Sequence, residues 1–175
     1  ITGVGFQPDW TWIKDRSDTS SHTITDAVRG ATKTIVSNDN NGENISSQHL
    51  QSFNSDGFTV GQSNAVNQSG VSNVSWNWRA ATGAGSANTD GSINTTSGFS
   101  IVAYGGNGTS GATVGHGLGV IPKMIIVKRR NAVGGWIVYN ETLGNTKIME
   151  LEEMAGSQTS SAAWNNTSPT SSVFT

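Results

Sequence analysis

Short apolar segments separated by polar turns run along the whole chain, and several of them alternate apolar with polar residues. The clearest is segment 72–79, in which Val74, Trp76 and Trp78 recur at every second position. A period of two places these side chains on one face of an extended strand. Turn signals rich in Gly, Asn, Asp and Ser recur every 8 to 12 residues or so, a spacing typical of β-sandwiches. The pattern therefore predicts an all-β, antiparallel fold.

Other strands are predicted where short β-branched or aromatic runs lie between turns. They span 10–14, 22–26, 32–36, 58–60, 99–104, 124–128 and 136–139. Segment 48–53 is ambiguous, and segment 147–154 fits either a strand or a single helical turn. Residues 61–71 are expected to form a polar loop.

The chain nearly repeats itself, because residues 3–38 align with 117–152 at a constant offset of 114. Eight aligned positions are identical, among them Gly30 with Gly144, and apolar positions also agree. Nothing catalytic is repeated, which favours a structural or binding role over an enzyme.

The repeat predicts two related antiparallel β-sandwich modules, 1–80 and 98–175, joined by a Gly/Ser/Thr/Asn-rich connector over 81–97. The second copy stops where the first continues to Trp78, so we expect the last strand of the second module to be missing. The sequence begins with Ile1 rather than Met, which suggests a fragment or a processed product.

Composition narrows the function classes. Only 13% of the residues are charged and the net charge is −2, so the chain offers no electrostatic surface for nucleic acid or an anionic membrane. Without cysteine, neither a disulfide framework nor a thiolate metal site can form. No apolar run approaches the roughly 20 residues of a membrane-spanning helix, so membrane insertion is not expected.

Several runs of sequence resemble a repeated module of marine tailed bacteriophages. They lie at 5–14, 26–30, 53–59, 98–104, 112–128, 136–139 and 164–171. The resemblance implies a virion protein of the tail or fibre type, on the extracellular surface of the particle, with a lectin-like jelly-roll fold. From the analogy with fibres we expect a homo-oligomer, with a trimer favoured.

Aromatic residues are the leading candidates for a ligand or interface site, and they are Trp10, Trp12, Trp76, Trp78, Trp136 and Tyr139. They could fill a sandwich core, form a subunit interface, or stack on sugar rings. The core interpretation is favoured because Ile126 stands in the second copy where Trp12 stands in the first. If one of the tryptophans is exposed, the sequence favours Trp10, which follows Pro8 and Asp9 at a strand start.

No cofactor or catalytic residue is predicted. Residues 106–111 match a dinucleotide-binding fingerprint, but the glycines and proline that follow exclude the helix such a site needs. His22, His49 and His116 show no paired metal-ligand spacing. Loop 39–43 is rich in side-chain oxygens, which leaves calcium as a minor alternative, although it lacks a full ligand set. The basic residues Lys123, Lys128, Arg129 and Arg130 are expected to form structural ion pairs with Asp15, Asp18 or an adjacent subunit, and phosphate binding is the less favoured alternative.

These observations predict a phage virion structural protein, a tail fibre or surface appendage that assembles with itself and with other virion proteins and that binds a host-surface receptor such as a glycan. Two alternatives remain open. One is a capsid or tail decoration protein that contacts only virion partners, and the other is an extracellular module that binds or cleaves glycans. Cleavage would need two carboxylates across a groove.

Overall fold

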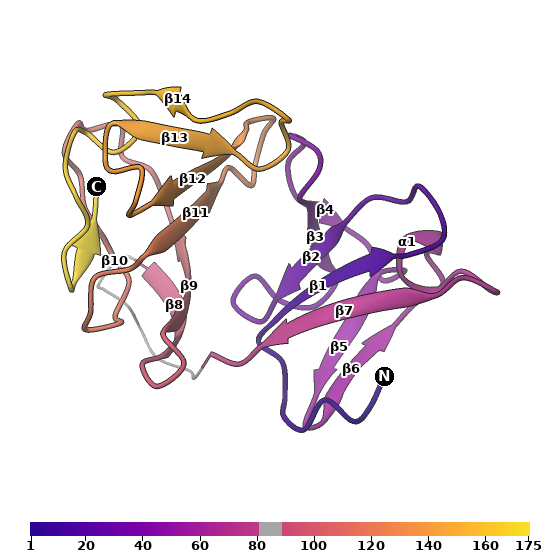
Figure 1. Cartoon of the computed structure of the whole chain (residues 1–175). Coiled ribbons are helices and arrows are strands. Elements are labelled where there is room, and N and C mark those ends of the chain that lie inside the picture. The colour runs from indigo at the N-terminus through magenta and orange to yellow at the C-terminus, as the bar shows by residue number, and fades with distance from the viewer. Residues whose placement is uncertain (81–88) are drawn as a thin grey trace. The chain divides into compact units, whose positions relative to one another are not determined.

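The computed structural model describes residues 1–80 and 89–175. Nearly all of its regular structure is β-strand, and the strands pair antiparallel (Figure 1), which confirms the predicted all-β class. The chain divides into two compact units. Unit 1 comprises Ile1–Ala80 with Arg130–Gly134, and unit 2 comprises Ala81–Arg129 with Gly135–Thr175.

Unit 1 is built around a five-stranded sheet in the order β4-β3-β2-β1-β7. Its elements are β1 Trp10–Asp15, β2 Thr23–Asp26, β3 Lys33–Val36, β4 Asn44–Ile45, β5 Leu50–Asn54, β6 Gly57–Val60, α1 Asn64–Asn67 and β7 Asn73–Trp78. Strands β5 and β6 form a separate hairpin, so the ambiguous segment 48–53 contains a strand. The polar loop expected over 61–71 contains the one-turn helix α1, which Ser63 caps by accepting a hydrogen bond from the Ala65 N–H.

The core of unit 1 lies between this sheet and the β5–β6 hairpin with α1 (Figure 1). Ile13 of β1 packs there with Leu50, Phe58 and Val66, and each of the four is at most 5% exposed. Burying such side chains contributes on the order of 2 kcal/mol each, which holds the hairpin and the sheet together.

Unit 2 has a four-stranded sheet in the order β11-β12-β13-β14, together with the two-stranded sheets β8-β9 and β10-β15. Its elements are β8 Thr89–Asn94, β9 Phe99–Tyr104, β10 Val114–Gly115, β11 Met124–Lys128, β12 Trp136–Asn140, β13 Lys147–Glu150, β14 Gln158–Thr159 and β15 Val173–Phe174. The core of this unit gathers Tyr139, Ile148, Trp164 and Phe174.

The connector predicted over 81–97 is partly wrong. Its first residues, 81–88, lie outside the described residues, but Thr89–Asn94 forms strand β8, paired along its length with β9. This segment has almost no apolar side chains, and backbone hydrogen bonding to an adjacent strand makes it extended in spite of its composition. Segment 147–154 forms a strand, β13, over its first four residues.

The repeat in the sequence is a repeat in backbone structure. The pairs Trp12↔Ile24 and Ile24↔Ile35 of unit 1 recur at an offset of 114 as Ile126↔Val138 and Val138↔Met149. All eight Cα pairs that join β1 to β2, β2 to β3 and β3 to β4 have such a counterpart among β11, β12, β13 and β14. The two sheets are therefore one meander used twice, with β7 added in unit 1 and no counterpart of it among the described strands of unit 2. The finer prediction of lectin-like jelly-roll sandwiches remains a prediction, because a jelly roll needs Greek-key connections.

One turn shows how the repeat keeps its register. Gly30 and Gly144 both have positive φ, at 99° and 79°. The N–H of Gly30 donates to the Asp26 carbonyl oxygen at 3.0 Å, and the N–H of Gly144 donates to the Asn140 carbonyl oxygen at 3.1 Å. Glycine adopts this left-handed conformation without a Cβ penalty, which explains why both copies carry it.

We predict that Gly30→Ala and Gly144→Ala each lower the free energy of unfolding by about 1 kcal/mol, measured by urea denaturation. A Cβ at either position meets no atom within 4 Å, so the loss reports backbone strain alone. Gly106→Ala is the matched control, because that glycine has neither a positive φ nor a close neighbour. An equal effect in all three variants would contradict this account of the turn.

Candidate functional site

Four tryptophans form a row across two adjacent strands of unit 1, which we call the tryptophan ladder: Trp10, Trp12, Trp76 and Trp78. In the β1–β7 pairing Trp10 lies opposite Trp78, and Trp12 lies opposite Trp76. Ring centroids are 4.6 Å apart in the first pair and 5.9 Å apart in the second, and the Trp10 and Trp12 rings are 5.7 Å apart. The edge-to-face and tilted geometry is favourable for aromatic rings and stabilises the pairing of β7 with β1.

The ladder lies on the face of the sheet opposite the core of unit 1. Along β1 the odd positions, including Ile13, are buried, whereas Trp10 and Trp12 are half-buried. Since side chains alternate between faces, the ladder cannot belong to the Ile13 core. The core interpretation favoured from the sequence is therefore wrong for these four residues.

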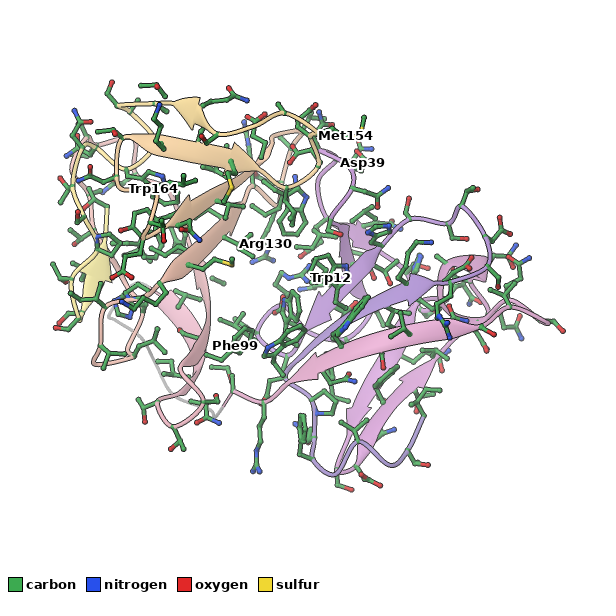
Figure 2. All side chains as sticks on the ribbon, viewed as in Figure 1. Trp12, Asp39, Phe99, Arg130, Met154 and Trp164 are labelled. Atoms are coloured by element: carbon green, nitrogen blue, oxygen red, sulfur yellow. The ribbon has the colours of Figure 1, made fainter. Side chains whose placement is uncertain are left out.

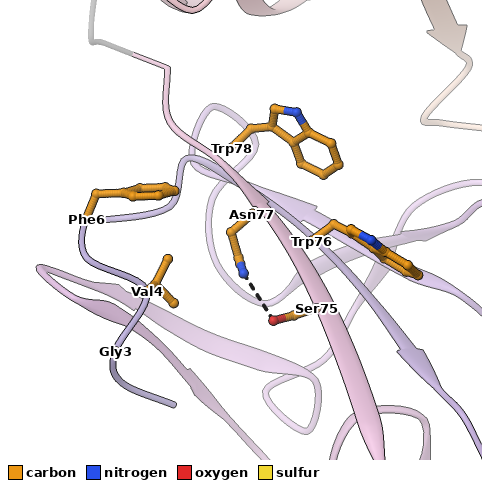
Figure 3. A pocket seen from close by; sticks show the side chains of 7 residues that line it. All are labelled: Gly3, Val4, Phe6, Ser75, Trp76, Asn77 and Trp78. Atoms are coloured by element: carbon orange, nitrogen blue, oxygen red, sulfur yellow. Dashed lines mark hydrogen bonds between the residues drawn. The ribbon is translucent and has the colours of Figure 1, made fainter.

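Trp76 is the exposed member of the ladder, at 47%, and not Trp10 as the sequence predicted. The reason is topological, because β7 is the last strand of its sheet and one side of it carries no neighbouring strand among the described residues. Trp76 and Trp78 project from one side of β7, and Ser75 and Asn77 from the other (Figure 3).

An open pocket of about 450 Å³ runs along β7 beside the N-terminal segment, lined by Gly3, Val4, Phe6, Ser75, Trp76, Asn77 and Trp78 (Figure 3). Asn77 Nδ2 donates to Ser75 Oγ at 3.1 Å, and Asn77 Oδ1 is enclosed and accepts no hydrogen bond within the described part of the chain. The pocket therefore combines apolar rings with amide and hydroxyl groups.

Asp56 fixes one wall of this pocket. Its carboxylate accepts hydrogen bonds from the backbone N–H groups of Gly5 at 2.6 Å and Gly3 at 3.0 Å. These two bonds favour the ionised form and hold the pKa of Asp56 below its ordinary value.

Asp9 anchors the ladder at the point where β1 begins and β7 ends. Its N–H donates to the Trp78 carbonyl oxygen at 2.9 Å, and its Oδ2 accepts from the Ala80 N–H at 2.7 Å. Burial raises the pKa of Asp9, although the bond from Ala80 and the charge of Arg79 act in the opposite direction. The carboxylate is used to join two strands, which is a structural role.

Trp136 and Tyr139 do not extend the ladder, and their burial corrects the prediction that they offer a ligand or interface surface. Trp136 is 4% exposed, and its backbone N–H donates to the Glu152 carboxylate at 2.9 and 3.1 Å. Tyr139 is 3% exposed and packs edge-to-face on Trp164, with the ring centroids 5.6 Å apart. Trp164 lies among the side chains that fill unit 2 (Figure 2).

An ionic network that was not predicted from the sequence joins three segments of unit 1: the turn with Arg29, the loop with Glu43, and residues 130–134. The Arg29 guanidinium pairs with Asp26 through Nε and with Glu43 through Nη1, the latter at 3.2 Å. The Arg130 Nε also lies 3.2 Å from Glu43 Oε2, so one carboxylate sits between two cations. Arg130 thus makes an ion pair, but with Glu43 rather than with Asp15 or Asp18.

Burial opposes ionisation of Glu43, but hydrogen bonds and charge from Arg130 and Arg29 outweigh it and hold the pKa of Glu43 below its ordinary value of 4.5. The two arginines beside Glu43 also argue against calcium binding at loop 39–43. Two guanidinium groups repel a cation, and Asp39 already accepts hydrogen bonds from Asn41 at 2.6 and 2.9 Å. Within residues 1–80 and 89–175, no three His, Asp or Glu side chains gather in a way that could hold a metal ion.

We predict that Glu43→Gln lowers the free energy of unfolding by about 2 kcal/mol at pH 7, because it removes one of the two carboxylates that pair with buried Arg29. Since the folded-state pKa lies below 4.5, the wild-type advantage should be complete above pH 4.5 and disappear as the pH falls below it. Urea denaturation between pH 3 and pH 7 measures this difference. The exposed Glu153→Gln is the control, and a wild-type advantage that grows toward acid would contradict the prediction.

None of the helices in the described parts of the chain has the length and apolar character to span a membrane. Comparison with curated proteins and with solved structures yields no match to this sequence. A family model, described as a domain of unknown function (DUF7483), matches residues 1–175 and so spans both units. The chain belongs to the DUF7483 family.

Proposed function

We propose that the chain is a non-enzymatic structural module of a bacteriophage virion, a tail-fibre or other surface-appendage part that assembles with copies of itself. The observation that carries this proposal is the uncovered apolar surface at β11 of unit 2. Val120, Ile121, Met124 and Ile126 follow one another within seven residues, and each is 42% to 58% exposed. Contiguous exposed apolar side chains of this kind are typical of protein interaction sites.

The duplicated backbone supports the same proposal. The carboxylates of Asp9, Asp56 and Glu43 serve the fold, and the three members of the ionic network that lie in the first copy have no charged counterpart in the second. The positions 114 residues after Asp26, Arg29 and Glu43 are Asn140, Leu143 and Ser157. A repeat that preserves strands and turns but no reactive groups suits an assembly module. The resemblance to tailed-phage modules supplies the virion setting, and the trimer expected from that resemblance remains a prediction.

A decoration protein that contacts only virion partners would use the same apolar surface. The location of the chain in the particle therefore distinguishes an appendage protein from a decoration protein. We predict that electron cryo-microscopy of the intact particle finds this chain in an external appendage, with β11 against another subunit. If the chain lies on the capsid or tail wall, the decoration alternative replaces the appendage. If it is absent from the particle, the virion proposal fails.

Glycan binding is a second candidate, favoured by the pocket beside β7. The exposed indole of Trp76 and the ring of Phe6, which both line this pocket, offer flat apolar surface for a sugar ring.

We predict that, if host glycans bind here, Trp76→Ser weakens binding to a glycan array at least tenfold, an effect of about 1.4 kcal/mol. Ile126→Ser is the control, because it removes a similarly exposed apolar side chain away from the pocket. Absence of any glycan signal for the wild-type chain, or equal losses in both variants, would remove this candidate.

A further inference from the structure

The dipeptide Asn-Gly occurs twice in the chain, as Asn41-Gly42 and as Asn107-Gly108. An asparagine in this dipeptide can lose its side-chain amide without an enzyme. The backbone nitrogen of the next residue is held close to the side-chain carbonyl carbon, and glycine has no Cβ that obstructs its attack. The two dipeptides lie in different surroundings, and these surroundings predict which of the two asparagines reacts.

Asn107 and Gly108 lie in an exposed, glycine-rich loop of unit 2. Every residue of 104–111 is exposed, and a Cβ added at Gly108 would meet no atom within 4 Å. The backbone of such a loop changes conformation at low cost, because no packed neighbour has to move. The Gly108 nitrogen can therefore reach the Asn107 side chain while the rest of the unit stays folded.

A hydrogen bond within this loop also activates the Asn107 side chain. The Thr109 N–H donates to Asn107 Oδ1 at 2.9 Å, which forms an Asx turn. Negative charge develops on Oδ1 when a nitrogen attacks Cγ, and a donor that is already in place stabilises this charge. Residues 104–111 include no Asp or Glu that would oppose it.

Asn41-Gly42 is held in place by residues 130–134 within unit 1. A Cβ added at Gly42 would lie 2.7 Å from the Arg130 carbonyl oxygen, so the two backbones are in close contact. They are joined by hydrogen bonds from the Gly134 N–H to the Asn40 carbonyl oxygen at 2.9 Å and from the Glu43 N–H to the Arg130 carbonyl oxygen at 2.7 Å. Rotation of the Gly42 nitrogen toward the Asn41 side chain would disturb these contacts, which costs free energy before any bond forms.

Asp39 opposes the reaction at Asn41 further. Its Oδ2 accepts a hydrogen bond from Asn41 Nδ2 at 2.6 Å, and its Oδ1 accepts one from the Asn41 N–H at 2.9 Å. A carboxylate this close to the amide repels the negative charge that would develop on Asn41 Oδ1.

We propose that Asn107 is a site of spontaneous deamidation in the folded protein, and that the contacts with residues 130–134 protect Asn41. The Gly108 nitrogen gives its proton to a base in the solvent and forms a bond to Asn107 Cγ. The bond from Cγ to Nδ2 then breaks, and the amide nitrogen takes up a proton from water and leaves as ammonia. Water opens the resulting cyclic imide at either carbonyl, which yields an aspartyl or an isoaspartyl residue at position 107.

The net reaction consumes one water and releases one ammonia. It adds one negative charge to a loop that has none, in a chain whose formal net charge is −2. The inference goes beyond the proposed function and does not depend on it.

Peptide mapping by mass spectrometry tests the proposal. The full chain is incubated in mildly alkaline buffer, and the aspartyl and isoaspartyl products at positions 41 and 107 are quantified over time. We predict that position 107 converts at least tenfold faster than position 41 in the folded chain. In guanidinium chloride at the same pH the two positions should convert at similar rates, because the dipeptide is the same and the contacts of Asn41 are lost.

Two glycine variants of the same loop provide a matched pair. Gly108→Ala places a Cβ beside the reacting nitrogen and should slow conversion at position 107 at least tenfold. Gly106→Ala should leave the rate unchanged, because that glycine has open space around it but does not supply the nitrogen. Circular dichroism checks that both variants are folded.

Equal rates at the two positions of the folded chain, or a faster rate at position 41, would overturn the proposal. A tenfold difference that persists in guanidinium chloride would also overturn it, because the contacts of the folded chain would then not be the cause. A rate at position 107 that Gly108→Ala leaves unchanged would exclude attack by the Gly108 nitrogen.

Discussion

Antiparallel backbone pairing in a fixed register decides which side chains of this protein are buried and which face outward. Along β1, Ile13 points into the core of unit 1 while Trp12 points to the opposite face. A slip of one residue would exchange the two faces, so every property of the ladder depends on the register. The turns that set the register, such as those at Gly30 and Gly144, recur in both units with the same hydrogen bond.

The sequence pattern was sufficient for the fold class and for the long strands other than β8, because apolar alternation and turn residues are local signals. It could not assign the faces of β1, where Trp12 and Ile13 are adjacent and both apolar. What decides between them is the layer that covers one face, and that layer comes from Leu50, Phe58 and Val66, far along the chain. Helix α1 is too short to show a helical period, and β8 is too polar to resemble a strand.

The ionic network could not be predicted from local sequence patterns either, because Glu43 and Arg130 are 87 residues apart in the chain. One signal was nevertheless present. In a chain with few charges, Asp26, Arg29 and Glu43 are charged only in the first copy, while their counterparts are Asn140, Leu143 and Ser157. Where two repeats share a backbone, a residue that differs between them can have a structural role in one copy alone. Here that role is to hold residues 130–134 against residues 1–80 within unit 1.

The comparison of the two units also bears on the exposed apolar side chains of β11, because the chain carries little charge. With a net charge of −2 and only 13% charged residues, electrostatic repulsion between copies is weak. A five-residue strand bearing exposed Met124 and Ile126 would then favour uncontrolled association unless its contacts were specific. In unit 1 the equivalent edge is covered by β7, with indoles packed on indoles. Among the described residues the two copies of the sheet therefore end differently, with the exposed Trp76 on β7 in unit 1 and the exposed Met124 and Ile126 on β11 in unit 2.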